Sequence, residues 1–284
     1  PGFKGGSSSY KLTENSNTYE ALARMDPNFA KNFIKNTPLY LGAQSSTSGP
    51  VYLGIVIVFL FVLGMFILDN RFKWWILAVS VLGIMLAWGK NFMGLTDFFM
   101  HNIPGYNKFR TVSMTLVIPQ ITFPILAILT LHKVLFEDID KEKLLKGLKW
   151  AGGIVGGLSL IFLVIPSLAG NFSGARDMMY VDKLSGGNEQ ARNSLMDILL
   201  PALESDRMSM LRKDAFRSLV FVLLSGGLIY LYKIKGQKMN LKLVIGLFAL
   251  FIVADMWPVN KRFLNDSNFE RKSQVQVPYA STAA

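Results

Sequence analysis

The feature that most constrains this chain is a series of long apolar stretches that contain no charged residue. Of its 284 residues, 51% are hydrophobic and only 17% are charged, against about 25% charged residues in an average soluble domain. A helix needs about 20 apolar residues to cross a hydrocarbon core about 30 Å thick. The sequence therefore predicts an all-α polytopic transmembrane helix bundle, and it excludes an ordinary soluble enzyme, a disordered chain and a disulfide scaffold.

Six stretches are apolar and long enough to be predicted as membrane spans. They are Val51–Leu68, Trp74–Trp88, Val112–Leu131, Trp150–Leu168, Ser218–Tyr232 and Leu243–Trp257. The third contains Pro119 and Pro124, which predict a kink because proline lacks a backbone donor and clashes with the preceding turn. The fourth carries four glycines between positions 152 and 157, and such small residues favour close helix packing.

The orientation of these spans is predicted from the cations of three short connections. Those cations are Arg71, Lys73, Lys133, Lys141, Lys143, Lys146, Lys149, Lys233, Lys235, Lys238 and Lys242. Because short cytoplasmic loops carry an excess of Lys and Arg, we expect these connections in the cytoplasm and both ends of the chain outside it. The formal charge of +11 is then mostly a topology signal, and nucleic acid is not an expected partner.

This topology divides the chain into three regions. Residues 1–49 form an extracytoplasmic loop with a short amphipathic helix over 18–35. Residues 50–258 form the six-helix transmembrane region, which includes an extracytoplasmic segment, 170–216, whose amphipathic helix is expected to be interrupted at Pro201. Residues 259–284 begin a further extracytoplasmic segment. The first residue is not Met, and we expect the chain to be an internal fragment of a longer protein.

The residue types present exclude several kinds of site. The chain has no cysteine and two histidines, so no metal site is predicted and no cofactor is indicated. The sequence LSGGNEQAR, Leu184–Arg192, is similar to the signature loop of ATP-binding-cassette ATPases, but no phosphate cradle of the form GxxxxGK[ST] accompanies it. We predict a Gly-Gly turn before a helix and no nucleotide site. For the acidic pair Asp138 and Asp140, a solvated loop is favoured over a metal site.

The segment PGYNKFRTVSM holds the candidate residues for binding a lipid-linked phosphate. These are Tyr106, Asn107, Lys108 and Arg110. They lie just outside the membrane at the predicted start of the third span, where a helix N-terminus adds partial positive charge. Arginine also offers a planar fork that can bind a phosphate through two hydrogen bonds. The alternative, that the two cations contact lipid headgroups, stays open.

Asp255 is an ionisable residue inside a predicted span. It lies toward the outer end of the sixth span, and an ionisable group at membrane depth is a functional hypothesis by default. The alternative is a local structural role, with Asp255 hydrated or paired with Lys261 or Arg262.

Four ordered segments of the chain resemble the bacterial YfhO family of multipass membrane proteins. They are PGFKGGSSSY, PLYLGAQSSTSGPVYLG, LAWGKNFMGLTDFFMHNIPGYNKFRTVSM and ADMWPVNKRFLN. The resemblance implies a GT-C-like architecture in the bacterial cytoplasmic membrane, with an extracytoplasmic active site. It further implies that a polyprenyl-phosphate-linked sugar is the donor and a cell-envelope polymer the acceptor.

The resemblance assigns no catalytic residue to this chain. Enzymes of GT-C type usually carry the catalytic carboxylate in their first extracytoplasmic loop, and that loop is not found here, so Asp97 and Asp255 are candidates for a supporting role only. A transporter or flippase for a lipid-linked or amphiphilic substrate is the alternative, and it would place polar groups near the bilayer midplane. Gln120 and Thr122 form the polar cluster there. A non-catalytic membrane subunit is the third possibility.

Overall fold

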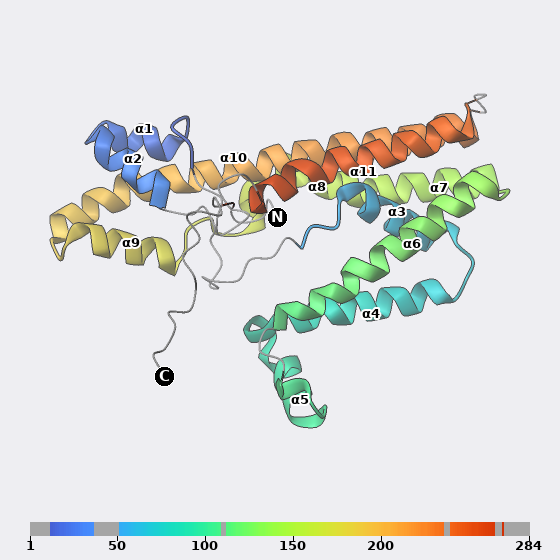
Figure 1. Cartoon of the computed structure of the whole chain (residues 1–284), viewed down its shortest axis with the longest axis horizontal. Helices are drawn as coiled ribbons and strands as arrows, with labels where there is room; N and C mark the ends of the chain where they lie inside the picture. Colours follow the sequence, from blue (N-terminus) through green and yellow to red (C-terminus); the bar gives the residue numbers. More distant parts are fainter. Residues whose placement is uncertain (1–11, 37–50, 109–111, 236–238, 265–268, 270–284) are drawn as a thin grey trace, which may run out of the picture.

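The computed structural model describes residues 12–36, 51–108, 112–235, 239–264 and 269, and the regular elements among these residues are all helices. Figure 1 shows an elongated helix bundle with a smaller helical lobe at one end. We call the end of the bundle next to the lobe the lobe end, and the opposite end the loop end. The α-helices are α1 (Asn17–Ala23), α2 (Pro27–Asn36), α3 (Ile55–Ile67), α4 (Phe72–Ala87), α5 (Met93–Asn102), α6 (Val117–Phe136), α7 (Lys141–Ala151), α8 (Gly157–Val164), α9 (Ala175–Ser185), α10 (Glu189–Ile229) and α11 (Leu241–Phe263).

Helix α3 forms the centre of the bundle. It packs against α6, α7, α10 and α11, and Phe59, Leu60 and Leu63 are buried at these contacts. An apolar helix surrounded by other helices has no water-facing side, which explains why charged residues are absent from α3.

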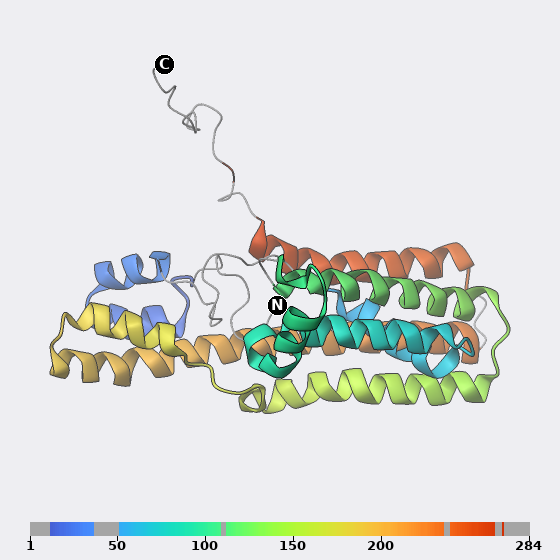
Figure 2. The same cartoon turned by 90° about the horizontal axis from the view of Figure 1, so that it is seen from below.

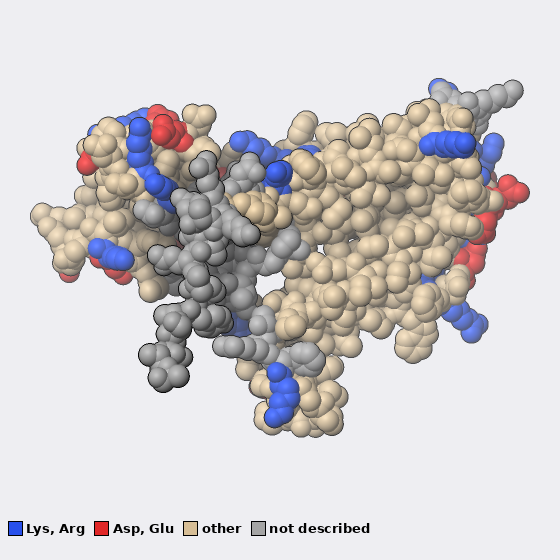
Figure 3. Space-filling model, viewed as in Figure 1, with Lys and Arg blue, Asp and Glu red and all other residues tan. Residues whose placement is uncertain are grey.

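The outer surface of the bundle is also apolar. Ile128 on α6, Leu223 on α10 and Leu250 on α11 are exposed, and the face seen in Figure 3 is uncharged between the lobe end and the loop end. Soluble monomers rarely expose apolar surface of this extent, whereas a surface in contact with lipid must be apolar.

Among the residues that the structure describes, four helical segments are long and apolar enough to cross a membrane. They are Val112–Phe136, Lys141–Val164, Glu189–Ile234 and Leu241–Phe263. A fifth is obtained if α4 and the following segment Gly89–Asn102, which is bent from it by 111°, count as one span. The chain thus has the helices of a multi-pass membrane protein.

The first predicted span is shorter in the structure than in the sequence prediction. Helix α3 has 13 residues, or about 20 Å at 1.5 Å per residue, because the helix begins only after Gly54. Gly54 has a φ of +83°, a conformation that glycine adopts without steric cost, and residues 51–54 approach the helix as extended chain.

The fourth predicted span begins earlier than expected. The structure corrects the prediction that Lys141–Lys149 is a loop, because these residues lie in α7, which continues through a π-helical turn at Gly152–Gly156 into α8. The side chain of Asp140 caps α7 by accepting hydrogen bonds from the backbone N–H groups of Glu142 and Lys143. Asp140 is one of the two acids for which a solvated loop was favoured, and its carboxylate has this structural use.

Helix α10 connects the lobe to the bundle. Its 41 residues extend over about 60 Å, and the same helix passes from the lobe into the bundle in both Figures 1 and 2. The prediction that a helix is interrupted at Pro201 is wrong, because α10 continues through it. Leu199 and Leu203 are buried against the lobe on either side of the proline, and this packing holds the helix where one backbone hydrogen bond is missing.

The lobe consists of α1, α2, α9 and the first half of α10. Where the sequence predicts one amphipathic helix over 18–35, the structure has two, because Asp26 caps α2 by accepting hydrogen bonds from the N–H groups of Asn28 and Phe29. Pro27 then begins α2, a position where its missing donor costs nothing. The predicted apolar side is confirmed in part: Leu22 is buried in the lobe core, whereas Met25 is exposed.

Two neighbouring charged residues of α10 hold the lobe together. Asp206 accepts hydrogen bonds from the backbone N–H groups of Asn17 and Thr18 at 2.8 and 2.9 Å, and so caps α1. Arg207 is 1% exposed and donates to both oxygens of Asp177 at 2.7 and 2.8 Å, and to the carbonyl of Phe172 at 2.6 Å. These bonds fix α1 and α9 against α10.

Candidate functional site

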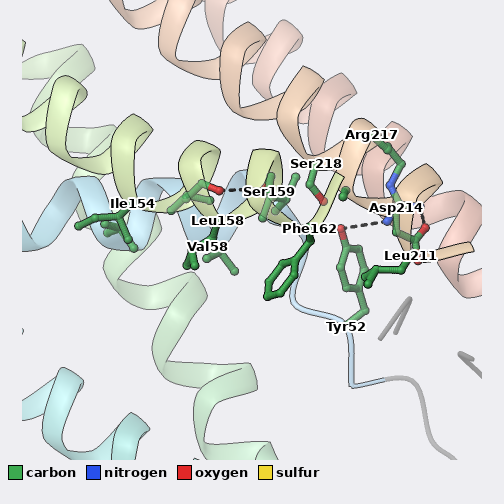
Figure 4. A pocket seen from close by; sticks show the side chains of 14 residues that line it. Tyr52, Val58, Ile154, Leu158, Ser159, Phe162, Leu211, Asp214, Arg217 and Ser218 are labelled. Atoms are coloured by element: carbon green, nitrogen blue, oxygen red, sulfur yellow. Dashed lines mark hydrogen bonds and ion pairs between the residues drawn. The ribbon is translucent and has the colours of Figure 1, made fainter. Parts of the chain in front are cut away.

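An elongated cavity of about 350 Å³ lies between α3, α8 and α10, toward the lobe end of the bundle. Its walls are almost entirely apolar and include Val58, Leu158 and Phe162. The charged and phenolic groups that line it, Tyr52, Asp214 and Arg217, come together at one end, as Figure 4 shows. The cavity therefore has an apolar body and one polar end.

Asp255 organises this polar end from the neighbouring helix α11. Its side chain is fully buried, at 0% exposure. One carboxylate oxygen accepts the hydroxyl of Tyr52 at 2.7 Å, and the other accepts the backbone N–H of Ile55 at 2.6 Å. Ile55 is the first residue of α3, so Asp255 caps α3 from a helix about 200 positions further along the chain.

Gly54 makes this cap possible. A Cβ atom on Gly54 would lie 3.3 Å from a carboxylate oxygen of Asp255, and its φ of +83° is strained for any other residue type. The glycine thus supplies both the turn into α3 and the room for the carboxylate.

The cation nearest to Asp255 is Arg217 of α10. The Nε of Arg217 lies 3.3 Å from Asp255, and Nη1 lies 3.1 Å from Asp214, which is one turn earlier on the same helix. Nη2 donates to the Tyr52 hydroxyl at 3.4 Å, and the guanidinium lies 5.6 Å from the centre of the Tyr52 ring. The side chain is 18% exposed and contributes to the wall of the cavity.

Asp214 has a second and shorter partner. Arg262 of α11 donates to both of its oxygens, at 2.7 and 2.6 Å, which is the strongest geometry for an arginine and a carboxylate. The ionic contacts of the polar end therefore run from Arg262 through Asp214 and Arg217 to Asp255, and they join α10 and α11 to the start of α3.

The residues predicted to bind a lipid phosphate lie elsewhere. Tyr106, Asn107 and Lys108 form a short 3₁₀ helix after α5, and none of the three lines the cavity. Tyr106 is half-buried and its ring packs against Phe99 at 5.5 Å, whereas Asn107 and Lys108 are exposed. Arg110 lies outside the described residues.

The two candidate carboxylates are separated in the structure. Asp97 is exposed on α5, which lies apart from the C-terminal end of α11 in Figure 1. Asp255 is the acid that reaches the cavity's polar end, where it pairs with Arg217 rather than with the neighbours on its own helix. Of those neighbours, Arg262 binds Asp214, and Lys261 lies over the ring of Trp257 at 5.7 Å.

Sequence analysis missed Tyr52, Asp214 and Arg217. A signal was present, because Asp214 and Arg217 are an acid and a base three positions apart directly before the predicted fifth span. Residues with this spacing are neighbours on one helix face. Nothing in the local sequence, however, indicated that Tyr52 and Asp255 lie against that face.

The remaining motifs have structural uses. LSGGNEQAR is confirmed as a Gly-Gly turn before a helix: Gly186 and Gly187 have φ angles of +58° and +86°, and Asn188 caps α10. In the part of the chain that the structure describes, no three His, Asp or Glu side chains come together in a way that could hold a metal ion.

A separate set of charges lies at the loop end. Lys143 donates a hydrogen bond to Asp69 and, with its positive charge, lowers the pKa of that carboxyl. Lys133 does the same to Glu137, whose pKa is also lowered. Both carboxylates are solvated, so these pairs tie the connections between helices to one another.

Comparison of the chain with protein-family models, with curated proteins and with solved structures gave no match.

Proposed function

We propose that this chain is the membrane-spanning part of a protein that binds an amphiphilic, lipid-linked substrate in the cavity between α3, α8 and α10. One observation carries the proposal: the cavity is apolar along its body and polar at one end, as its occupant would be. Ligand sites typically combine an apolar lining with a few convergent polar groups.

The reaction that we propose for the whole protein is glycosyl transfer of GT-C type. The donor would be a polyprenyl-phosphate-linked sugar and the acceptor a cell-envelope glycopolymer, as the similarity to the YfhO family implies. The polar groups support transfer at one membrane face, because they lie at one end of the bundle rather than halfway along it. We assign no catalytic base, since Asp255 is occupied in capping α3.

The polar groups halfway along the bundle give less support to a transporter than to a glycosyltransferase. The hydroxyl of Thr122 on α6 bonds to Ser80 of α4 at 2.6 Å and to the carbonyl of Ile118 at 3.0 Å. These contacts join two helices, and this use of a threonine needs no substrate.

The topology that we propose has six spans: α3, α4, α6, α7 with α8, the second half of α10, and α11. Helix α3 is short for a span, and its position among the other helices allows neighbouring chain and a locally thinner bilayer to compensate. An even number of spans places both ends of the chain on one side. We propose that the lobe end is extracytoplasmic, in the bacterial cytoplasmic membrane, because the cationic connections lie at the loop end.

Filling the cavity tests the binding proposal. Ser218 lines the cavity, so Ser218→Phe places a ring inside the space that the substrate would occupy, whereas Leu224→Phe places a ring on an exposed side of the same helix. In the full-length protein, Ser218→Phe should lower crosslinking to a diazirine-labelled polyprenyl phosphate, and envelope glycosylation, at least about tenfold. Leu224→Phe should leave both within about twofold at equal membrane abundance. Equal crosslinking of the two variants would refute the cavity as the binding site.

A pair of cysteine variants tests the orientation, since the chain has no cysteine of its own. Lys183 of α9 and Lys146 of α7 are exposed at the lobe and the loop end. In intact cells an impermeant maleimide should label Lys183→Cys and should label Lys146→Cys only after permeabilisation. The opposite pattern would reverse the proposed topology.

A further inference from the structure

Arg217 makes longer and fewer hydrogen bonds than the other charged residues of the cavity's polar end. Its Nε atom is buried and, within the part of the chain that the structure describes, makes no hydrogen bond. Its three contacts with Asp214, Asp255 and Tyr52 are 3.1, 3.3 and 3.4 Å long. A guanidinium has five N–H donors, and a buried donor without an acceptor costs free energy.

The two carboxylates beside Arg217 have shorter bonds to other donors. Asp214 is held by Arg262 at 2.6 and 2.7 Å, and Asp255 by Tyr52 and the Ile55 N–H at 2.7 and 2.6 Å. Neither carboxylate depends on Arg217 for its hydrogen bonds. The guanidinium can therefore turn toward a new acceptor at the cavity while both buried carboxylates keep hydrogen bonds to other donors.

The charge balance around this end of the cavity favours an anion. Residues 208–218 of α10 and 252–263 of α11 together carry five cations and two acids. Asp214 and Asp255 are the acids, and the cations are Arg212, Lys213, Arg217, Lys261 and Arg262. The cations outnumber the acids by three, and a net positive field raises the local concentration of anions.

We propose that Arg217 binds the anionic head of the amphiphile, a phosphate or a carboxylate, while the apolar body of the cavity holds its chain. This inference rests on the proposed function and adds the residue that binds the anionic headgroup. A planar guanidinium binds oxyanions through two parallel hydrogen bonds, which the ammonium group of lysine does not match. Ser218, which also lines the cavity, is placed to donate its hydroxyl to the same head.

The inference is tested by direct binding to the full chain in nanodiscs of zwitterionic phosphatidylcholine. The three radiolabelled probes are dodecyl phosphate, dodecanol and inorganic phosphate, each corrected for binding to protein-free nanodiscs. We expect dodecyl phosphate to bind at least about tenfold more tightly than dodecanol, and inorganic phosphate to bind at least about tenfold more weakly than dodecyl phosphate, because charge-assisted hydrogen bonds and chain burial both contribute.

Variants of two arginines on the same helix separate a specific contact from general charge. Arg217→Gln should bind dodecyl phosphate and dodecanol equally. Arg217→Lys keeps the positive charge and should show only part of the preference for dodecyl phosphate. The lysine variant tests the assignment even if Arg217→Gln fails to fold. Arg212 is exposed and does not line the cavity, so Arg212→Gln should keep the preference for the phosphate.

Each binding result other than those expected would overturn one part of the proposal. Equal binding of dodecyl phosphate and dodecanol to the unaltered protein would refute an anionic headgroup, and with it the polyprenyl-phosphate donor, and would leave standing the binding of an amphiphile in the cavity. An equal loss of preference in Arg212→Gln and Arg217→Gln would refute the assignment of Arg217. Inorganic phosphate binding as tightly as dodecyl phosphate would show an anion site without a chain site, and no binding of any probe would refute the proposed function as well.

Discussion

Buried charge is used differently in the lobe and at the cavity's polar end. In the lobe, Arg207 and Asp177 are 1% and 3% exposed as side chains, and they meet through two short, parallel hydrogen bonds. At the cavity, Arg217 is 18% exposed, its contacts are all longer than 3.0 Å, and its Nε makes no hydrogen bond in the described structure. The pair of Arg207 and Asp177 is thus enclosed by protein, whereas Arg217 faces a cavity.

This difference separates charges that hold the fold from charges available to a ligand. A buried ion pair is destabilising when one partner is removed, because the other charge then has no compensation. An arginine whose acidic neighbours are satisfied by other donors can be changed at less cost. Amide hydrogen exchange, which reports local opening free energies, can measure both regions in the same molecule.

The largest effect is expected in the lobe, from Asp177→Ala. The substitution leaves Arg207 charged and buried, and we expect the opening free energy of the lobe amides to fall by about 3–5 kcal/mol. Hydrogen exchange of α1, α2 and α9 measures this change. Asp182→Ala, which removes the exposed pair of Asp182 with Arg192, is the control and should cost at most about 1 kcal/mol. Similar losses in the two variants would mean that the buried pair is not what holds the lobe.

A smaller effect is expected from Asp255→Asn at the cap of α3. The amide keeps one acceptor oxygen, but its NH₂ group faces a donor where the carboxylate had an oxygen. We expect a loss of about 1–3 kcal/mol, confined to the amides of the first turn of α3 and read there by hydrogen exchange. Leu250→Ala, on an exposed face of the same helix, should leave those amides unchanged. Unaltered exchange in Asp255→Asn would contradict the assignment of Asp255 as the cap.

The substitution Arg217→Lys tests directly whether the charges at the cavity contribute less to stability than the buried pair of the lobe. Because Asp214 and Asp255 keep their shorter bonds to other donors, we expect the stability of the bundle to change by less than about 1 kcal/mol. Exchange of the α10 and α11 amides around the polar end checks this directly. A loss as large as that of Asp177→Ala would show that Arg217 belongs with the structural charges and that the two regions do not differ.

The smallest effect is expected from the solvated pair of Asp69 and Lys143 at the loop end. The pKa of Asp69 is lowered in the folded protein, so its ionised form favours folding above the unfolded pKa of about 3.9, and that contribution is lost as the pH falls through the lowered folded pKa. Thermal unfolding of the protein in nanodiscs should show this loss below about pH 4. Asp69→Asn should flatten that part of the profile and lower the midpoint at pH 7 by the same small amount, and an unchanged acid limb would contradict the role of the pair.

The helices were predictable because their signals are local. Uncharged runs such as Ser218–Tyr232 predict a helix wherever they occur, since every backbone group in lipid must be satisfied within its own segment. The predicted helix boundaries were wrong where a single residue or a tertiary contact overrides the local pattern of hydrophobicity. Gly54 delays the start of α3, Asp26 divides the predicted helix over 18–35, and packing in the lobe carries α10 through Pro201.

Of the residues at the cavity's polar end, the sequence predicted only Asp255. Asp255 was singled out because it is an acid within an apolar span, which is again a local signal. The segment from Tyr106 to Arg110 was singled out for its own composition, and its described residues, 106–108, do not line the cavity. Tyr52 carried no local signal, because a tyrosine at the edge of a span is common, and the spacing of Arg217 from Asp214 did not show that the two face Tyr52 and Asp255.

The sequence by itself determined that this chain forms apolar helices of membrane-spanning character, because hydrophobicity and chain length act within each segment. Only the tertiary structure decided which polar residues meet. Tyr52, Arg217 and Asp255 are 165 and 38 positions apart along the chain, and they come together because α3, α10 and α11 pack side by side. Such a contact depends on the relative register of three helices, a property that no single segment contains.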